Sequence, residues 1–364
     1  MSNAYAQAGV DVEAGERAVA LMKASVLAAS RPEVVGGFGG FAGLFDASRL
    51  KGYRRPLLAT GTDGVGTKVV VAQRMGIHHT IGIDLVAMIA DDIVVCGAEP
   101  LFLTDYIATG KVEPQVVADV VRGVAEGCRL AGMALIGGET AEHPGVMAAG
   151  EYDLAGAGTG VVEADELLGA ERVRAGDVLV GIGASGLHSN GYSLARQVLL
   201  GEAGAKAGLA LEREVAELGR TLGEELLEPT RIYALDLLAL ARELGAGLHS
   251  MSHITGGGIA ANIARVLPAE LAADVRRGTW QVLPVFDLIA RTGAVAQRDM
   301  EATFNMGLGM VAVVDRDSAD AAVSFLEERG LPASIIGQVR ARAIGEVGDA
   351  AAKGGHGGAV SVIG

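Results

Sequence analysis

The sequence predicts an α/β protein with two domains. Its 364 residues exceed the usual size of a single domain. Short apolar runs alternate with amphipathic stretches along most of the chain, as strands alternate with helices in such proteins. The polar, charged segment 163–175 separates two of these series. We therefore expect an N-terminal domain over 1–170, a C-terminal domain over 171–345 and a flexible tail over 346–364.

Composition limits the partners and the location expected for the chain. The formal net charge of −14 argues against nucleic acid or an anionic membrane as a main partner. Cys96 and Cys128 lie in apolar helical contexts without metal-binding spacing, as reduced core residues do. No signal-peptide core precedes Gly9, and no apolar run reaches membrane-spanning length. These features predict a soluble cytoplasmic protein.

A glycine-rich motif, Thr60–Lys68, follows the apolar strand expected at Pro56–Ala59. Its glycines let the backbone approach an anion closely. Asp63 can hold a divalent cation, and Lys68 can neutralise a phosphate. A P-loop is excluded, because the order Thr67-Lys68 reverses its Lys-Ser/Thr pair and an aspartate lies inside the turn. Taken alone, the motif fits a glycine-rich hairpin equally well.

The other elements expected in this half follow from periodicity, capping residues and proline. They are a helix over Glu13–Ala29 with Asp11 as N-cap, the loop Gly36–Gly40, a helix over Val69–Met75, a helix from its cap Asp84 to Cys96, the strand Leu101–Ala108, a helix over Pro114–Ala131, and the strands Met133–Ile136 and Tyr152–Val162. The loop fits either a nucleotide lid or a plain linker.

Acidic residues on these elements are candidate cation ligands. Asp91 and Asp92 are adjacent on an otherwise apolar helix, where carboxylates are costly unless they are solvated or bound to a cation. Helical spacing does not decide between them. Glu139 is expected in a loop after a strand, where ligands to catalytic metals often lie. Glu142 and His143 are weaker candidates.

The second half presents polar loops at the starts of helices. After the strand Val178–Ile182, the segment Gly183–Gly191 offers Ser185, Gly186, His188 and Asn190 before a helix that begins near Tyr192. The spacing of Gly181, Gly183 and Gly186 imitates a dinucleotide fingerprint, but the acidic residue expected further along is absent, so we reject that interpretation.

Further elements complete this half. A helix is expected to start within Leu227–Tyr233, with Thr230 and Arg231 in its first turn. The strand Leu248–Ile254 ends in Thr255, Gly256, Gly257 and Gly258, whose amides could meet an anion before a helix from Ile259. The remaining elements are the strands Met310–Val314 and Ile335–Val339 and the helix Ser318–Arg329.

Taken together, these motifs resemble the phosphoribosylformylglycinamidine cyclo-ligase (AIR synthetase) family over nearly the whole chain. The matching segments, in colinear order, are Tyr5 with Ala8–Asp11, Gly36–Gly40, Gly61–Lys68, Gly82–Met88, Gly97–Phe102, Gly137–Glu142, Ser185–Ser193, Pro229–Tyr233, Ile254–Gly258 and Thr303–Gly307. The resemblance implies an ATP-dependent superfamily that includes selenophosphate synthetase and thiamine-monophosphate kinase. It implies a two-domain α+β fold, with the N-terminal halves of a homodimer pairing into a β-barrel.

The resemblance also implies roles for individual residues. The catalytic candidates are Asp63, Lys68 and His188, and the implied Mg²⁺ ligands are Asp63, Asp92 and, more weakly, Glu139. The residues implied to bind ATP are Lys23, Gly36, Gly37, Gly39, Gly64, Gly66, Thr67, Asp105 and Glu139. The residues implied to bind the substrate, formylglycinamidine ribonucleotide, are Ser185, Gly186, Asn190, Thr230, Arg231, Thr255, Gly256, Gly257 and Gly258.

Two positions depart from the family pattern, and two alternatives stay open. Asp91 stands where the family usually has Asn, and His143 where it usually has Met. The expected reaction is ring closure after the ATP γ-phosphoryl group activates the formyl oxygen. One alternative is another phosphoryl transfer on the same scaffold, and the other is a catalytically silent nucleotide-binding subunit. His188 fits either a catalytic or a structural role.

Overall fold

The computed structural model describes residues 12–36, 39–352 and 354–364. The expected N-cap Asp11 and the candidate Gly37 lie outside the described residues. The chain divides into two compact units. Unit 1 comprises Met1–Val94 with Ala98–Asp165, and unit 2 comprises Val95–Gly97 with Glu166–Gly364.

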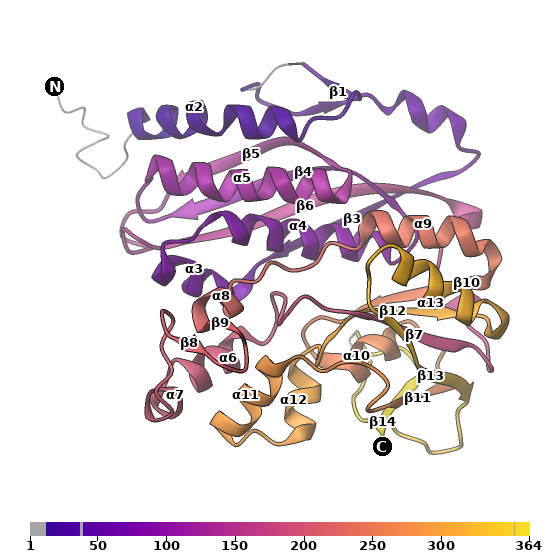
Figure 1. Cartoon of the computed structure of the whole chain (residues 1–364). Helices are drawn as coiled ribbons and strands as arrows, with labels where there is room; N and C mark the ends of the chain where they lie inside the picture. The colour runs from indigo at the N-terminus through magenta and orange to yellow at the C-terminus, as the bar shows by residue number, and fades with distance from the viewer. Residues whose placement is uncertain (1–11, 37–38, 353) are drawn as a thin grey trace. The chain divides into compact units, whose positions relative to one another are not determined.

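Unit 1 is a mixed sheet covered on one face by helices. The sheet has the order β3 (Pro56–Gly64), β6 (Tyr152–Glu163), β4 (Glu99–Thr109), β5 (Ala134–Glu142). β4 and β5 are parallel, whereas β6 is antiparallel to both its neighbours. The helices α2 (Val12–Ala28), α5 (Pro114–Ala131) and α4 (His79–Val94) lie side by side across the sheet (Figure 1).

Glycines on β6 bring helix α4 close to the sheet. A Cβ atom on Gly156, Gly158 or Gly160 would come within 2.8, 2.5 and 2.5 Å, respectively, of side-chain atoms of Ile89 or Ile93. Interiors are packed too tightly to absorb such overlaps without movement. The glycine-rich pattern of this strand therefore serves helix packing.

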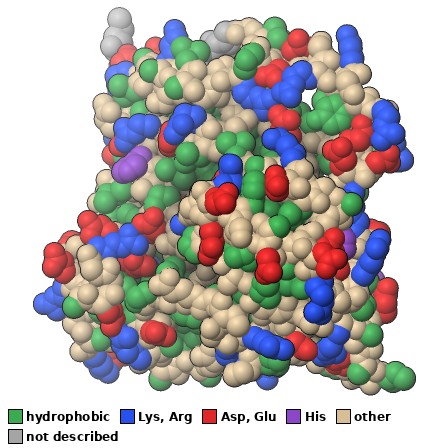
Figure 2. Space-filling model, turned by 45° about the vertical axis from the view of Figure 1, so that its right-hand side comes forward, with side chains coloured by type: hydrophobic (Ala, Val, Ile, Leu, Met, Phe, Trp, Pro, Cys, Tyr) green, Lys and Arg blue, Asp and Glu red, His purple; other side chains and the backbone are tan. Residues whose placement is uncertain are grey.

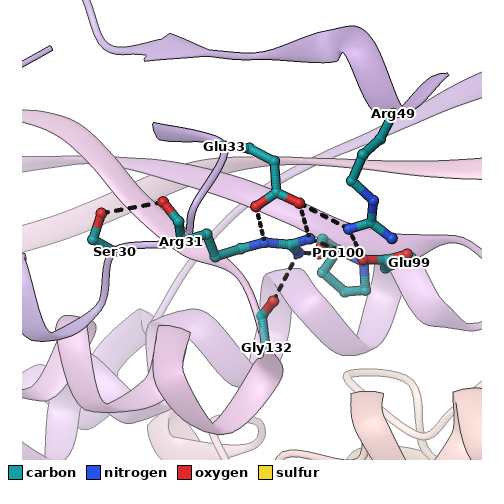
Figure 3. A network of polar contacts seen from close by, with 7 residues as sticks. All are labelled: Ser30, Arg31, Glu33, Arg49, Glu99, Pro100 and Gly132. Atoms are coloured by element: carbon teal, nitrogen blue, oxygen red, sulfur yellow. Dashed lines mark hydrogen bonds and ion pairs between the residues drawn. The ribbon is translucent and has the colours of Figure 1, made fainter. Parts of the chain in front are cut away.

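The opposite face of the sheet is partly open. Leu58 and Tyr106 on this face are 64% and 41% exposed. A segment with β1 (Val34–Val35), β2 (Leu44–Phe45) and η1 (Ala47–Gly52) borders a cavity of about 320 Å³ against the sheet. Figure 3 shows the polar network that attaches this segment to the rest of unit 1.

Two arginines and two glutamates form that network. Arg31 contacts Glu33 and Glu99 at 3.2 and 3.1 Å, and it also donates to the backbone oxygens of Pro100 and Gly132. Arg49 contacts Glu33 at 2.8 Å. Hydrogen bonds from Arg31 and then Arg49 lower the pKa of Glu33 to about 2. The start of the segment is thereby joined to β4 and to the turn before β5.

Unit 2 is built on a second sheet. Its order is β10 (Leu248–His253), β12 (Leu308–Val314), β7 (Val178–Gly183), β13 (Ala333–Ala341), β11 (Leu271–Arg276), β14 (Ala359–Ile363). Only the β11–β14 pair of this described sheet is parallel. The helices of this unit are α6 (Tyr192–Leu199), α7 (Glu202–Lys206), α8 (Leu222–Leu226), α9 (Ala234–Leu244), α10 (Gly258–Arg265), α11 (Pro284–Gly293), α12 (Gln297–Thr303) and α13 (Ala319–Glu328). A small hairpin consists of β8 (Glu214–Val215) and β9 (Arg220–Thr221).

The prediction of a flexible tail over 346–364 was wrong for its last residues. β14 pairs with β11 in register from Ala272↔Ala359 to Arg276↔Ile363. Val360 is fully buried. Val360 and Val362 alternate with Ser361, a strand pattern that is short and follows a glycine-rich stretch.

Two motifs expected as loops are parts of strands. Residues 60–64 of the glycine motif continue β3, and residues 137–142 continue β5. Both segments are glycine-rich, which disfavours strands by propensity, but pairing with β6 and β4 satisfies their backbone groups. The helix over Val69–Met75 (α3) follows a 3₁₀ turn, η2 (Gly66–Lys68).

Two helix starts also differ from the prediction. Asp84 does not cap α4, because the helix begins five residues earlier, at His79. Residues 227–233 form no helix, and α9 begins at Ala234. Pro229 lacks the N–H group needed to continue α8 beyond Leu226, and Thr230 and Arg231 lie in the loop before α9.

Candidate active site

The acidic candidates of unit 1 fall on both faces of the sheet. Asp63 and Asp105 are both in register with Gly156, and Asp105 is also in register with Gly138. Directly paired residues point to the same face, so Asp63 and Asp105 lie on the helix-covered side. Glu139 follows Gly138 on β5 and therefore points to the open face, beside Tyr106.

The buried carboxyl group of Asp105 lies directly beside Gly138, its partner on the neighbouring strand β5. A Cβ atom on Gly138 would lie 1.9 Å from Asp105 Oδ1. Burial raises the pKa of Asp105 to about 7, while a hydrogen bond from its own backbone opposes that shift. The absence of a side chain at Gly138 is what leaves room for this carboxyl group.

Lys68 forms a fully buried ion pair. Its Nζ lies 2.8 Å from Asp84 Oδ1, and both side chains are 0% exposed. The lysine comes from η2 and the aspartate from the second turn of α4. Two buried charges are tolerated when each compensates the other. The pair joins the end of the glycine motif to α4.

The other unit 1 candidates differ in position and exposure. Asp63 accepts a hydrogen bond from the Gly64 amide at 2.7 Å. Asp92 is exposed on α4, whereas its neighbour Asp91 is fully buried. The candidates that lie elsewhere on the surface, or at turns, are Lys23 on α2, Gly36 and Gly39 with positive φ, and Gly66 and Thr67 in η2.

The described residues contain no cluster of three side chains arranged as metal ligands. The oxygen donors Asp63, Asp92 and Asp105 nevertheless have the chemistry that Mg²⁺ prefers, and a buried carboxylate such as Asp105 is stabilised by a nearby cation. Glu139 faces away from Asp63 and Asp105, so the sheet does not bring these three together. On the face shown in Figure 2, acidic and basic side chains are interspersed.

In unit 2, hydrogen bonds join the predicted substrate loops to one another. Ser185 Oγ donates to the backbone oxygen of Pro229 at 2.7 Å and accepts from the Arg231 amide at 3.1 Å. The hydroxyl groups of Ser189 and Thr230 are 3.2 Å apart. The Gly256 amide donates to Asn190 Oδ1 at 2.9 Å. Segments 185–190, 229–231 and 255–258 thus form one platform.

His188 belongs to this platform but is almost completely buried. Its side chain has a relative exposure of 1%, and its backbone has a φ of 61°. Nε2 accepts a hydrogen bond from the Ser185 amide at 3.2 Å, so the neutral ring carries its proton on Nδ1. A Cβ on Gly309 would lie 2.7 Å from His188 Cε1, which shows how closely β12 covers the ring.

Three buried residues that the sequence analysis did not single out complete the platform. Tyr233 donates its hydroxyl proton to the Gly183 oxygen at 2.9 Å. Asn305 donates to the Gly186 oxygen at 3.0 Å and accepts from the Gly307 amide at 2.8 Å. Asn262 binds the 255–258 turn. The sequence does carry a signal for one of them, because Asn262 is a polar residue inside the apolar stretch 259–263.

Comparison with known families identifies the class of protein. Residues 46–162 match the model of the AIR synthase related protein, N-terminal domain, and residues 174–349 match the corresponding C-terminal domain. The fold agrees with solved structures at low identity. Thiamine-monophosphate kinase from Stenotrophomonas maltophilia K279a superposes with a TM-score of 0.63 at 19% identity, covering 94% of this chain and 95% of that one. The hydrogenase maturation protein HypE in complex with ATP gives 0.62 at 18%, covering 90% and 86%.

Curated relatives define the family more narrowly. Phosphoribosylformylglycinamidine cyclo-ligase from Geobacillus kaustophilus (strain HTA426) is 53% identical over 93% of this chain and 96% of its own. The protein of the same name from Bacillus cereus (strain Q1) is 50% identical with the same coverage. The chain therefore belongs to the phosphoribosylformylglycinamidine cyclo-ligase family of enzymes. Among the described residues, none of the helices is long and apolar enough to span a membrane.

Proposed function

We propose that this chain closes the imidazole ring of aminoimidazole ribonucleotide. The substrate is formylglycinamidine ribonucleotide, and ATP is converted to ADP and phosphate. The γ-phosphoryl group is transferred to the formyl oxygen, which turns a poor leaving group into a phosphate ester. The amidine-side nitrogen then attacks the activated carbon, and phosphate departs as the ring forms. The observation that carries this proposal is the identity of 53% to a cyclo-ligase over 93% of the chain.

The charged groups proposed to bind Mg²⁺ and ATP lie in unit 1. Asp63 and Asp92, with Asp105 on the same side of the sheet, would hold Mg²⁺, which neutralises phosphate charge during phosphoryl transfer. Lys68 is fixed by Asp84 at the end of the glycine motif. In this position Lys68 would neutralise phosphate charge only if it left Asp84, or if its ammonium group contacted Asp84 and a phosphate at the same time. A sharing of this kind predicts that Asp84 affects catalysis as well as stability.

In unit 2, backbone amides are proposed to bind the ribonucleotide. The Thr255–Gly258 turn opens α10 and the Ser185–Asn190 segment precedes α6, so both can offer backbone amides to a phosphate. We assign His188 a positioning role, because its Nε2 holds the Ser185 amide and its ring is buried.

The proposed assembly is a dimer formed through the open face of the unit 1 sheet. Exposed apolar side chains on that face, such as Leu58 and Tyr106, support this proposal. Substituting Leu58 by lysine would place a charge in the interface. Light scattering should then report a monomer for this variant and a dimer for the natural chain, and two equal masses would contradict the proposal.

Release of ADP is the direct test of the reaction. ADP formation should require both Mg²⁺ and formylglycinamidine ribonucleotide, and aminoimidazole ribonucleotide should appear in equal amount. ADP release that is independent of the ribonucleotide, or that accompanies thiamine phosphate instead, would contradict the proposal. Complete absence of ADP would favour a silent nucleotide-binding subunit.

A further inference from the structure

Asn262 is a buried polar residue in the first turns of α10, and it is 1% exposed. Its Nδ2 lies 2.8 Å from the backbone oxygen of Gly258, 3.1 Å from that of Thr255 and 3.4 Å from that of Gly256. Only an NH₂ group can meet three carbonyl oxygens, so the orientation of this side-chain amide is determined. The side chain therefore binds the inner side of the 255–258 turn.

These contacts fix the direction of the peptide groups in the turn. In a trans peptide, the C=O of one residue and the N–H of the next point in opposite directions. Since the oxygens of Thr255 and Gly256 point to Asn262, the amides of Gly256 and Gly257 point away from it. The Gly256 amide does so visibly, because it donates to Asn190 Oδ1 at 2.9 Å.

The Gly257 amide is thereby presented at the N-terminus of α10, next to the segment that carries Asn190. Gly257 has a φ of 99°, a conformation that glycine adopts without strain. The Thr255 oxygen also accepts from the Gly258 amide at 3.1 Å, but the Gly256 oxygen would lose its donor without Asn262. Rotation of the peptide between Gly256 and Gly257 would then expose that oxygen and turn the Gly257 amide inward. A rotated turn would point carbonyl oxygens, not amides, at an anionic ligand.

We propose that Asn262 is a positioning residue for the nucleotide substrate of this enzyme. It holds the carbonyls of the Thr255–Gly258 turn inward, so that the Gly257 amide binds the substrate phosphate. This inference rests on the proposed function, in which the same turn binds the ribonucleotide. It adds a residue that does not touch the substrate and acts only through the turn.

The decisive variant is Asn262→Asp, which keeps the shape of the side chain and replaces its NH₂ donor by an oxygen. We expect the KM for formylglycinamidine ribonucleotide to rise about tenfold or more. The aspartate oxygen cannot donate to the carbonyl oxygens of the turn, and its negative charge repels them. The KM for ATP should stay within about twofold, because the 255–258 turn is proposed to bind the ribonucleotide and not ATP. A wild-type KM for the ribonucleotide would overturn the inference, as would equal increases in both KM values.

A control variant separates this effect from general loss of stability. Arg340→Gln removes contacts to Asp274 and Glu346 elsewhere in unit 2. It should lower the melting temperature without changing either KM. A rise in the ribonucleotide KM of this control, equal to that of Asn262→Asp, would assign the effect to stability and overturn the inference. If the natural chain itself releases no ADP with the ribonucleotide, the proposed function fails independently of either variant.

Amide exchange in the natural chain provides a test that needs no variant. In glycine-labelled protein, the Gly257 amide should exchange about tenfold or more faster than the hydrogen-bonded Gly256 amide. Adding formylglycinamidine ribonucleotide should slow the Gly257 amide selectively. Equal protection of the two amides in the free protein would overturn the inference, as would exchange at Gly257 that saturating ribonucleotide leaves unchanged.

Discussion

The two units place polar groups in contrasting ways. In unit 1 ionisable side chains are buried: Lys68 pairs with Asp84, and Asp105 lies in the layer between sheet and helices. In unit 2 the hydrogen bonds that hold the platform together are made by neutral groups, namely the side chains of Ser185, Asn262 and Asn305 with backbone amides and carbonyls. Charged groups bind cations and phosphates strongly but need compensation when buried, whereas neutral groups fix geometry at a lower desolvation cost.

This contrast implies different sensitivities. Loss of one charge in unit 1 should affect the chemical step or the stability of the fold strongly. Loss of one neutral contact in unit 2 should affect positioning more than folding. The variants below test the contrast in order of decreasing expected effect.

Asp63→Asn should give the largest effect. The amide keeps the size of the carboxylate but removes the charge proposed to hold Mg²⁺. We expect kcat to fall by about a thousandfold, or about 4 kcal/mol of barrier, with an unchanged circular dichroism spectrum. Steady-state kinetics at saturating Mg²⁺ and ATP measure this change. Activity like that of the natural chain would exclude a metal-binding role for Asp63.

Lys68→Met tests whether the buried ion pair is structural. The variant leaves Asp84 buried without its cation, which should reduce the free energy of unfolding by about 3–5 kcal/mol. The double variant Lys68→Met with Asp84→Leu should recover most of that loss, because no uncompensated charge remains. Urea denaturation measures both values. Should the double variant regain stability and activity together, Lys68 has no direct part in catalysis.

The pKa of Asp105 predicts a pH dependence of stability. Burial raises this pKa from 3.8 to about 7, so the folded protein retains a proton that the unfolded chain releases at lower pH. The contribution to stability is therefore full below about pH 4 and is lost as the pH rises to about 7. In the absence of divalent cations, the natural chain should lose about 2–3 kcal/mol more than Asp105→Asn between pH 5 and pH 8. Parallel pH profiles for the two proteins would show that the pKa is not raised.

Removal of the His188 imidazole should have the smallest effect of the four. His188→Ala removes the acceptor of the Ser185 amide, and we expect kcat to fall about tenfold while ATP affinity is unchanged. His188→Asn serves as the matched variant, because asparagine tolerates the φ of 61° at this position. An unchanged kcat in both variants would make this histidine a scaffold residue only. A drop comparable to that of Asp63→Asn would contradict the contrast between the units.

Local patterns were sufficient for much of the fold. Helix α5 begins at Pro114 and ends at Ala131 as expected, because proline, amphipathic spacing and the following Gly132 all act within a few residues. The strand β7 and the start of α6 at Tyr192 were likewise expected from local signals. The resemblance to the cyclo-ligase family also lies in the sequence itself, and the comparisons confirmed it.

Pairing between distant segments decided the rest. Residues 60–64 and 137–142 are glycine-rich and polar and do not themselves favour a strand, and pairing with β6 and β4 extends the preceding strands through them. The same register turns Glu139 away from Asp105, although both belong to neighbouring strands. Only the tertiary structure shows that Lys68 is buried against Asp84 and that Asn262 donates to the carbonyl oxygens of the 255–258 turn. A sequence determines which residues are able to bind or to pair, but which face and which partner each one meets depends on contacts between segments far apart in the chain.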